Sequence, residues 1–309
     1  MNKKRVCEIL KSKEKYDVFY DNRPVWIQEI DGNNIAKIGF VDKVEERDVY
    51  LKDLYKQRKI LGELAINDCK AKFASSGLGM VWAFLQPLLT LLVFWVVFQA
   101  GFKTAPISNV EFIVWFAPAY LIWMFFSEGL LQVTNSLVEY NYLIKKVNFK
   151  VNIIPPIKIV SSAIVHCGFI LFIIFLNFVY GYGISIYALQ VIYYFGCTCM
   201  LLLGMGWLFS ALNVFVKDVY NVVAVFTQIG FWATPVFWNA SEMDSNILLI
   251  LKLNPMYYIC EGYRETFIYK IWFWEHPAET VYFWAITVVL LIVGARTFDK
   301  LHKVFIDVL

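Results

Sequence analysis

Charged side chains are scarce in this 309-residue chain, and two long stretches lack them altogether. Only 17% of the residues are charged, compared with about 25% in average soluble domains. No charged residue lies between Lys72 and Lys103, and only His166 interrupts the uncharged run between Lys158 and Lys217. A run of about 20 apolar residues crosses the hydrocarbon core of a bilayer. The scarcity of charge therefore excludes a single soluble domain and indicates a polytopic membrane protein.

Motifs for nucleotide and metal chemistry are also missing. The sequence has no G-x-x-x-x-G-K-[ST] phosphate loop and no Gly-Lys pair, which excludes ATP hydrolysis through a P-loop of its own. The three histidines are far apart, the six cysteines show no paired metal spacing, and there is no Asp-x-Asp pair. A net charge of +3 is too small to indicate nucleic acid as a partner. We therefore expect no cofactor, no metal ion and no catalytic site in this chain.

Apolar runs long enough to span a membrane make up most of the chain after residue 77. The glycine-containing turn YGYGIS, residues 180–185, divides the longest of them, which is too long for one helix. We predict an all-α polytopic fold with six transmembrane helices. Their approximate ranges are 78–102, 112–137, 159–180, 186–215, 219–238 and 281–295, with 277 as the alternative start of the last.

Basic residues are concentrated on one side of these six segments. With a cytoplasmic N-terminus, the loops 139–158 and 213–218 and the tail after residue 295 lie inside, and all three carry Lys or Arg. The opposite face holds the uncharged turn and the segment 239–280, in which acidic residues outnumber basic ones. Lys and Arg favour the cytoplasmic side of a membrane protein. Both termini are therefore predicted to be cytoplasmic.

The first 77 residues differ in composition from the rest. Residues 1–50 form a predicted cytoplasmic extension, in which the alternating stretch KIGFV and a turn at 31–34 indicate a small β-rich cap. Residues 51–77 hold a predicted amphipathic helix, because apolar residues recur near helical spacing among Lys and Arg. Such a helix can lie in the cytoplasmic interface, and the alternative is a soluble helix packed on the preceding region. Residues 78–309 form the predicted six-helix transmembrane domain.

The external segment 239–280 is apolar and aromatic but interrupted by charged residues and by Asn254-Pro255. It does not fit a lipid-exposed span. Two short helices that dip part-way into the outer leaflet would fit it, because irregular backbone is tolerated at depth when protein surrounds it. The alternative is an amphipathic hairpin on the outer surface. The re-entrant candidates are Asn254, Pro255, Tyr257, Glu261 and Arg264.

Two ionisable side chains, Glu128 and His166, fall within predicted spans and are functional candidates for that reason. Glu128 either faces a neighbouring helix or a substrate pathway, or reaches the interface as a capping carboxylate. His166 is either a hydrogen-bonding residue or a proton relay. Aromatic side chains on the first and fifth spans either contact lipid or line a conduit in which sugar rings pack on them. The channel-lining candidates are Trp95, Phe98, Phe226, Phe231, Trp232 and Phe237.

A short basic element, EYNYLIKKVNFKVNIIPP at residues 139–156, separates the second and third predicted spans. Its lysines fit a cytoplasmic loop, but a solvated loop would leave its apolar side chains in water. A short amphipathic helix docked in a groove of a partner explains both the lysines and the apolar side chains. Pro155-Pro156 would end this helix. The predicted docking residues are Glu139, Tyr142, Leu143, Lys145, Lys146 and Phe149.

Four stretches resemble the permease subunits of ABC exporters for polysaccharides, O-antigens and teichoic acids. The resemblance runs in order from about residue 51 to the C-terminus and leaves out residues 1–48. It departs from the family at Asn67, where related permeases commonly carry Arg before the Asp. The stretches are KFASSGLGMVWAFLQPLLTLLVFWVVF (72–98), WMFFSEGLLQVTNSLVEYNYLIKKVNFKVNIIPP (123–156), FVKDVYNVVAVFTQIGFWATPVFW (215–238) and LNPMYYICEGYRE (253–265).

This resemblance implies a six-span half-transporter of a bacterial cytoplasmic membrane that forms a homodimer. It also implies two copies of a separate cytoplasmic ABC ATPase, which bind ATP and Mg²⁺ and dock on the element between the second and third spans. The dimer would enclose a channel for a polyprenyl-linked glycan, so the chain is a transport subunit in contact with membrane lipids and not an enzyme. Lys70 and Lys72 are then candidates for the cytoplasmic substrate entrance.

Two other functions compete with glycan export. The same architecture can export a drug or a small lipid. A polytopic enzyme acting on lipid-linked sugars would need an acid–base or metal constellation at one level of the membrane, and the sequence shows none.

Overall fold

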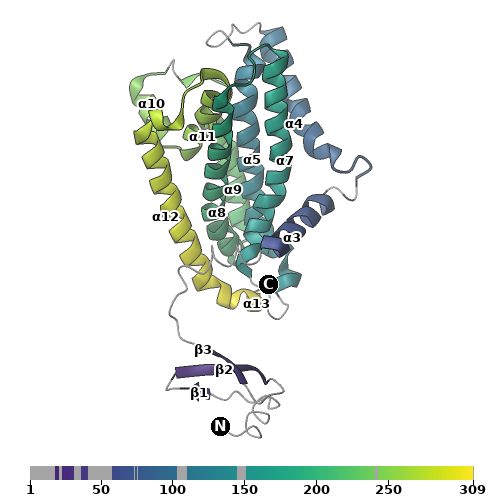
Figure 1. Ribbon diagram of the computed structural model, residues 1–309, viewed down its shortest axis with the longest axis vertical. Coiled ribbons are helices and arrows are strands. Elements are labelled where there is room, and N and C mark those ends of the chain that lie inside the picture. Colours follow the sequence, from purple (N-terminus) through teal and green to yellow (C-terminus); the bar gives the residue numbers. More distant parts are fainter. Residues whose placement is uncertain are drawn as a thin grey trace. The chain divides into compact units, whose positions relative to one another are not determined.

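The computed structural model comprises two compact units, Met1–Tyr55 and Lys56–Leu309 (Figure 1). The structure describes residues 18–20, 23–30, 36–40, 58–72, 74, 76–102, 110–144, 151–240 and 243–308.

The first unit contains a three-stranded antiparallel sheet of β1 (Val18–Tyr20), β2 (Arg23–Ile30) and β3 (Ala36–Phe40). β2 is the central strand, and its pairing with β3 has an irregularity between Ile27 and Glu29. Val, Ile and aromatic residues, which favour strands, recur in these segments. The expectation of β structure in this region is confirmed, and the all-α prediction holds only for the second unit.

The second unit is a bundle of helices, and among its described residues five helical segments are long and apolar enough to cross a membrane. Each contains a long apolar run with few or no charges, in which the backbone groups must satisfy one another within a helix. The main helices of these segments are α4 (Val81–Phe94), continued by η1 (Trp95–Gly101), α5 (Phe112–Glu139), α7 (Ile154–Val179), α8 (Val191–Phe215) and α12 (Pro277–Leu301).

The fifth predicted span, 219–238, forms the shorter helix α9 (Asp218–Ala233). Its 16 residues extend about 24 Å at 1.5 Å per residue, which is less than the hydrocarbon core of about 30 Å. The helix ends before Thr234-Pro235, because a residue that precedes proline is disfavoured in the α conformation. The sequence-based range is therefore too long at its C-terminal end, and a count of six spans stays a prediction.

The third predicted span begins earlier than expected. Pro155 and Pro156 lie in the first turn of α7, where the missing proline N–H has no intrahelical partner to lose. The proline pair therefore lies at the start of the long helix, directly after the short 3-10 turn η2 (Val151–Ile153). That it ends the preceding element stays a prediction, because residues 145–150 lie outside the described residues.

Helix α5 forms the centre of the bundle, since most of its side chains are buried along its whole length. It packs against α7, α8, α9 and α11 (Pro255–Arg264), while α4 and α12 lie on opposite flanks of this central group (Figure 1). Helices that are apolar on every side belong in such a buried position.

Helices α8 and α12 approach each other through Gly204 and Gly294. A Cβ atom added to Gly294 would collide with the carbonyl oxygen of Gly204, and one added to Gly204 would lie 2.8 Å from the backbone nitrogen of Leu291. Small residues allow this close backbone contact between membrane helices. The two glycines therefore fix α12 to the central group.

Short helices occupy both ends of the bundle (Figure 1). One end holds α3 (Arg58–Ala71) and α13 (Phe305–Val308), and the other holds α10 (Ser245–Lys252) and α11. Asn254 begins α11 as its N-cap, since its side-chain oxygen accepts a hydrogen bond from the backbone N–H of Met256. Two short helices thus meet at Asn254-Pro255, as the sequence predicts.

Candidate functional site

A cavity of about 280 Å³ lies between α4, α5 and α7. Tyr220 of α9 also contributes to its wall, and Lys72, just after α3, lies at its edge. The wall combines polar and aromatic side chains in a region where the surrounding helices are apolar. The side chains used below to characterise it are Lys72, Trp82, Phe125, Glu128, Gln132, Ser162, His166 and Phe169.

Lys72 and Glu128, which the sequence singles out separately, meet at this cavity. Nζ of Lys72 lies 3.9 Å from Oε2 of Glu128, and the two side chains are 43% and 46% exposed. A half-exposed pair of this kind contributes little to stability. The pair instead gives this part of the wall one charge of each sign.

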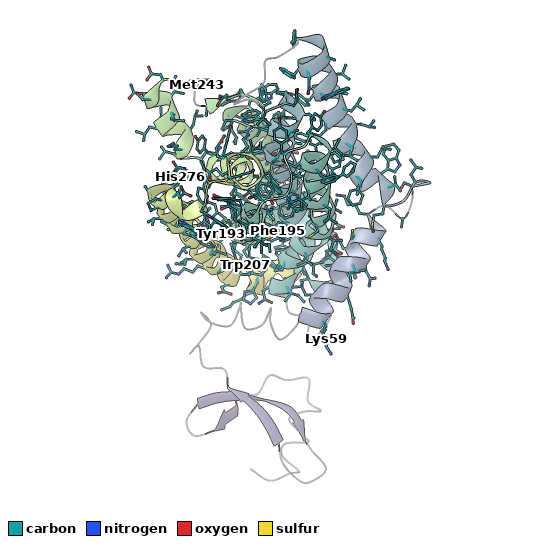
Figure 2. The ribbon with its side chains drawn as sticks, turned by 45° about the horizontal axis from the view of Figure 1, so that its top comes forward. Lys59, Tyr193, Phe195, Trp207, Met243 and His276 are labelled. Atoms are coloured by element: carbon teal, nitrogen blue, oxygen red, sulfur yellow. The ribbon has the colours of Figure 1, made fainter. Side chains whose placement is uncertain are left out.

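His166 forms the buried part of the cavity wall. Its Nε2 lies 3.0 Å from the hydroxyl oxygen of Tyr263, and Phe125 and Phe195 stack on its ring with centroid distances of 4.8 and 5.5 Å. Figure 2 labels Phe195 among the packed side chains of the bundle. Nδ1 of His166 is buried and has no hydrogen-bond partner among the described residues. Buried polar atoms are almost always paired, so this nitrogen is an exception in the interior of the bundle, where the neighbouring rings shield it.

Two further polar side chains of the wall bond to each other. The hydroxyl of Ser162 on α7 donates to Oε1 of Gln132 on α5 over 3.1 Å. Neither residue is charged, and the described residues contain no group of three His, Cys, Asp or Glu side chains that could hold a metal ion. The arrangement is suited to hydrogen bonding with a ligand.

Four of the six aromatic channel candidates come together between η1, α9 and the turn after α9. Phe237 has ring centroid distances of 6.5 Å to Phe98, 5.9 Å to Phe231 and 4.8 Å to Trp232. Trp95 and Phe226 are exposed and make no ring contact within the described part of the chain. The structure therefore brings the first and fifth predicted spans close together through aromatic contacts.

A buried ionic cluster joins α3 to the adjoining ends of α5 and α7. Nζ of Lys158 lies 2.6 Å from Oδ1 of Asp68 and 2.7 Å from Oε1 of Glu139. The hydroxyl of Tyr140 donates to Oδ1 of Asp68 over 2.6 Å, and Lys158 also lies 5.0 Å from the centre of its ring. Burial raises the pKa of Tyr140, and the neighbouring Asp68 carboxylate raises it further. Tyr140 therefore stays a hydrogen-bond donor.

The sequence alone did not single out Asp68 or Tyr140, and it treated Lys158 only as a loop charge. The available signal is that Lys158 belongs to a long helix otherwise free of charge, where a cation needs a partner. Of the predicted docking residues, Glu139 joins this cluster, Tyr142 is exposed and Leu143 is buried. Lys145, Lys146 and Phe149 lie outside the described residues. Lys70 is exposed on α3.

Arg264 connects α11 to α5 and to the turn after α9. It is fully buried, and its Nη1 donates to the carbonyl of Pro235 over 2.6 Å and to Oε1 of Glu261 over 2.5 Å. Nη2 donates to the carbonyl of Val236 over 2.6 Å, and Nε donates to the carbonyl of Trp115 over 3.3 Å. The guanidinium carbon lies 3.5 Å from the centre of the Trp115 ring. The guanidinium fork therefore satisfies three backbone carbonyls from two separate segments, α5 and the turn after α9.

The segment after α11 holds a second polar cluster. Glu265 accepts a hydrogen bond from the hydroxyl of Tyr194 over 3.1 Å and lies 3.0 Å from Nε2 of His276, which Figure 2 labels. Burial raises the pKa of Glu265, and the nearby His276 opposes that effect. Of the other re-entrant candidates, Asn254 donates to the hydroxyl of Thr234 over 2.7 Å, and Tyr257 is buried.

Long apolar helices around a polar cavity define a multi-pass membrane protein. Residues 62–268 match the sequence profile of the ABC-2 type transporter family, which is more than half of the chain. The chain belongs to the ABC-2 type transporter family.

The sequence is also similar to individual permease proteins over most of its length. The O-antigen export system permease protein RfbA of Myxococcus xanthus is 26% identical over 270 residues, which is 83% of this chain and 98% of the relative. An O-antigen export system permease protein RfbA of Klebsiella pneumoniae is 25% identical over 251 residues, which is 78% of this chain and 92% of the relative. The predicted resemblance to exporter permeases is thereby confirmed.

The N-terminal segment has a different relationship. Residues 1–56 match the profile of the small acid-soluble spore protein H family. The small, acid-soluble spore protein H of Acetivibrio thermocellus is 33% identical over 51 residues, which is 16% of this chain and 80% of that protein. The two compact units of the structure, divided at residues 55 and 56, thus match two different families.

Proposed function

We propose that this protein is the membrane-spanning subunit of an ATP-driven exporter that moves a polyprenyl-linked polysaccharide or teichoic acid out of the cytoplasm. The observation that carries the proposal is the similarity to O-antigen export permeases over nearly their whole length. The polar and aromatic cavity between α4, α5 and α7 supports it, because a hydroxylated cargo needs such surfaces.

The complete transporter in this proposal contains two copies of this chain and two copies of a cytoplasmic ATPase. The absence of a phosphate loop in the sequence supports a separate ATPase. Exposed apolar side chains on α4, η1 and α9, such as Val93, Trp95, Phe226 and Ile229, offer a face for lipid or for the second copy.

The same proposal places the protein in the bacterial cytoplasmic membrane with both termini inside. The distribution of Lys and Arg supports this orientation. In addition, α3 and α13 lie at one end of the bundle, and α10 and α11 lie at the other (Figure 1). In this orientation α3 lies in the cytoplasmic interface, and α10 and α11 form the re-entrant pair at the outer mouth.

Transport by a reconstituted complex tests the proposal. The chain is placed in liposomes with its partner ATPase, and polyprenyl-linked glycan extracted from the host membrane serves as the substrate. We expect glycan to become accessible on the opposite side only when ATP is hydrolysed, because this chain has no P-loop of its own. Liposomes with ATP replaced by a non-hydrolysable analogue are the control. Glycan movement by this chain alone, without nucleotide, would refute the proposal.

The segment 139–156 is proposed to couple the ATPase to the permease. We expect the double charge reversal Lys145→Glu/Lys146→Glu, or Phe149→Asp, to reduce ATPase co-purification at least about tenfold, which corresponds to about 1.4 kcal/mol of binding energy. The physical reason is that each change removes either the charge or the apolar side of a docked helix. Co-purification is measured from detergent, and Lys59→Glu at an exposed position of α3 is the matched control. Normal ATPase binding and normal transport by both the lysine double variant and Phe149→Asp would show that the segment is only a loop.

A further inference from the structure

The size of the cavity between α4, α5 and α7 limits what it can hold. Its volume of about 280 Å³ lies at the lower end of the range for small-molecule sites, which is about 300–1,000 Å³. A space of this size accepts one small ring and is too small for a stretch of several sugar units.

The charges at the cavity disfavour an ionic ligand. Lys72 and Glu128 supply one positive and one negative side chain only 3.9 Å apart. A phosphate placed beside them would be repelled by Glu128, and an ammonium group would be repelled by Lys72. The balanced pair therefore favours a neutral ligand.

Polar side chains of the wall can hydrogen-bond with a ligand. The ring of His166 contributes to the wall, but its unpaired Nδ1 is shielded from the cavity by the packing around it. Ser162 and Gln132, both half-buried, bond to each other in the same wall. The Gln132 amide has further donors and the Ser162 hydroxyl can still accept, so a ligand hydroxyl can pair with them, whereas an acyl chain cannot.

Aromatic side chains complete the wall. Trp82 of α4, Phe125 of α5 and Phe169 of α7 line the same cavity. Aromatic rings combined with a few convergent hydrogen-bonding groups suit a ligand that has both C–H faces and hydroxyl groups. A pyranose ring has both.

From these four properties we infer that the cavity binds one neutral sugar ring of the exported glycan, with Ser162 and Gln132 as hydrogen-bonding partners and Trp82 as a stacking partner. The inference rests on the proposed export of a lipid-linked glycan. It adds a subsite inside a single copy of the chain, between helices that also support the bundle.

A double variant, Ser162→Ala/Gln132→Leu, removes both partners of one hydrogen bond, so neither is left unpaired. The full complex is reconstituted, and its ATPase activity is measured against two probes, host-derived polyprenyl-linked glycan and sugar-free undecaprenyl pyrophosphate. We expect the glycan concentration for half-maximal stimulation to rise about tenfold, since the sugar loses hydrogen bonds worth about 1.4 kcal/mol in total. The corresponding concentration of undecaprenyl pyrophosphate stays the same.

Substitutions of Trp82 test the same subsite independently of the hydrogen-bonding pair. Trp82→Leu is expected to shift the glycan response in the same direction, and Trp82→Phe to restore it, because Phe keeps an aromatic face. Ile164→Val, on a side chain of α7 that is 40% exposed, is the matched control, and thermal unfolding in detergent checks that each variant is folded.

The outcomes separate the two proposals. If the unmodified complex does not respond to the glycan, the proposed function fails and the sugar subsite fails with it. If the unmodified complex responds and the cavity variants respond equally well, only the sugar subsite is overturned. An equal shift for the glycan and for undecaprenyl pyrophosphate also overturns the sugar subsite, because it shows that the cavity does not recognise sugar.

Discussion

Replacing Arg264 with Met is expected to lower the free energy of unfolding by about 3–5 kcal/mol, the range for breaking a buried ionic contact from one side. The variant leaves the carbonyls of Trp115, Pro235 and Val236 without the donors that now satisfy them. It also leaves Glu261 without its cation. Because these groups belong to α5, α11 and the turn after α9, all three elements should loosen together. Unfolding in detergent, followed by circular dichroism, measures the effect.

Two further variants show whether the geometry or only the charge of Arg264 matters. Arg264→Lys keeps the charge but cannot reproduce a guanidinium fork, so its loss of stability should fall between those of the wild type and of Arg264→Met. Lys252→Met removes a cation from the partly exposed pair with Glu279, whose side chains are 37% and 26% exposed, and should cost no more than about 1 kcal/mol. Equal stabilities for Arg264→Met and Lys252→Met would contradict the assignment of Arg264 as a central connection.

Replacing Lys158 with Met is expected to detach α3 from the bundle. Lys158 and Asp68 are both only 6% exposed in their side chains, so the change leaves a buried carboxylate without its cation and should cost about 3–5 kcal/mol. The specific readout is Cys69, which is 3% exposed on α3 beside Asp68. Maleimide labelling of Cys69, identified by peptide mass, should become much faster in the variant than in the wild type.

The double variant Asp68→Asn/Lys158→Met tests the cause of this detachment. It removes the charge from both partners, and Asn can still accept a hydrogen bond from Tyr140, so protection of Cys69 should largely return. Persistent protection of Cys69 in the single variant Lys158→Met would show that α3 is held by other contacts, such as those of Ala65, which is also buried.

The long helices could be predicted from the sequence because each one requires an uninterrupted apolar run. Helix α9 was predicted too long, since hydropathy continues through Phe237 and Trp238 while Pro235 stops the helix. The partners of the helices could not be predicted in this way. Lys158 and Asp68 are 90 residues apart, and Arg264 and Trp115 are 149 residues apart. Neither charge periodicity nor hydropathy specifies which helix faces which.

The residues of the candidate site were also only partly predictable from the sequence. Glu128 and His166 were singled out because ionisable groups are costly within a membrane, and both line the cavity. Ser162 and Gln132 carry no such signal, because uncharged polar residues are common in apolar helices. Their contribution follows only from the packing of α5 against α7.

The central position of α5 also has a consequence for the order in which the protein is assembled in the membrane. Apart from α4, the helices that surround α5 all follow it in the chain, so α5 enters the bilayer before most of its neighbours exist. During that interval its hydroxyl groups need partners within the helix itself. Thr134 donates to the carbonyl of Leu130 over 2.7 Å, and Ser136 donates to the carbonyl of Val133 over 2.6 Å. The hydroxyl groups of Thr134 and Ser136 are therefore already hydrogen-bonded when α5 is surrounded only by lipid. The later helices can pack around α5 without first breaking hydrogen bonds from these groups to other partners.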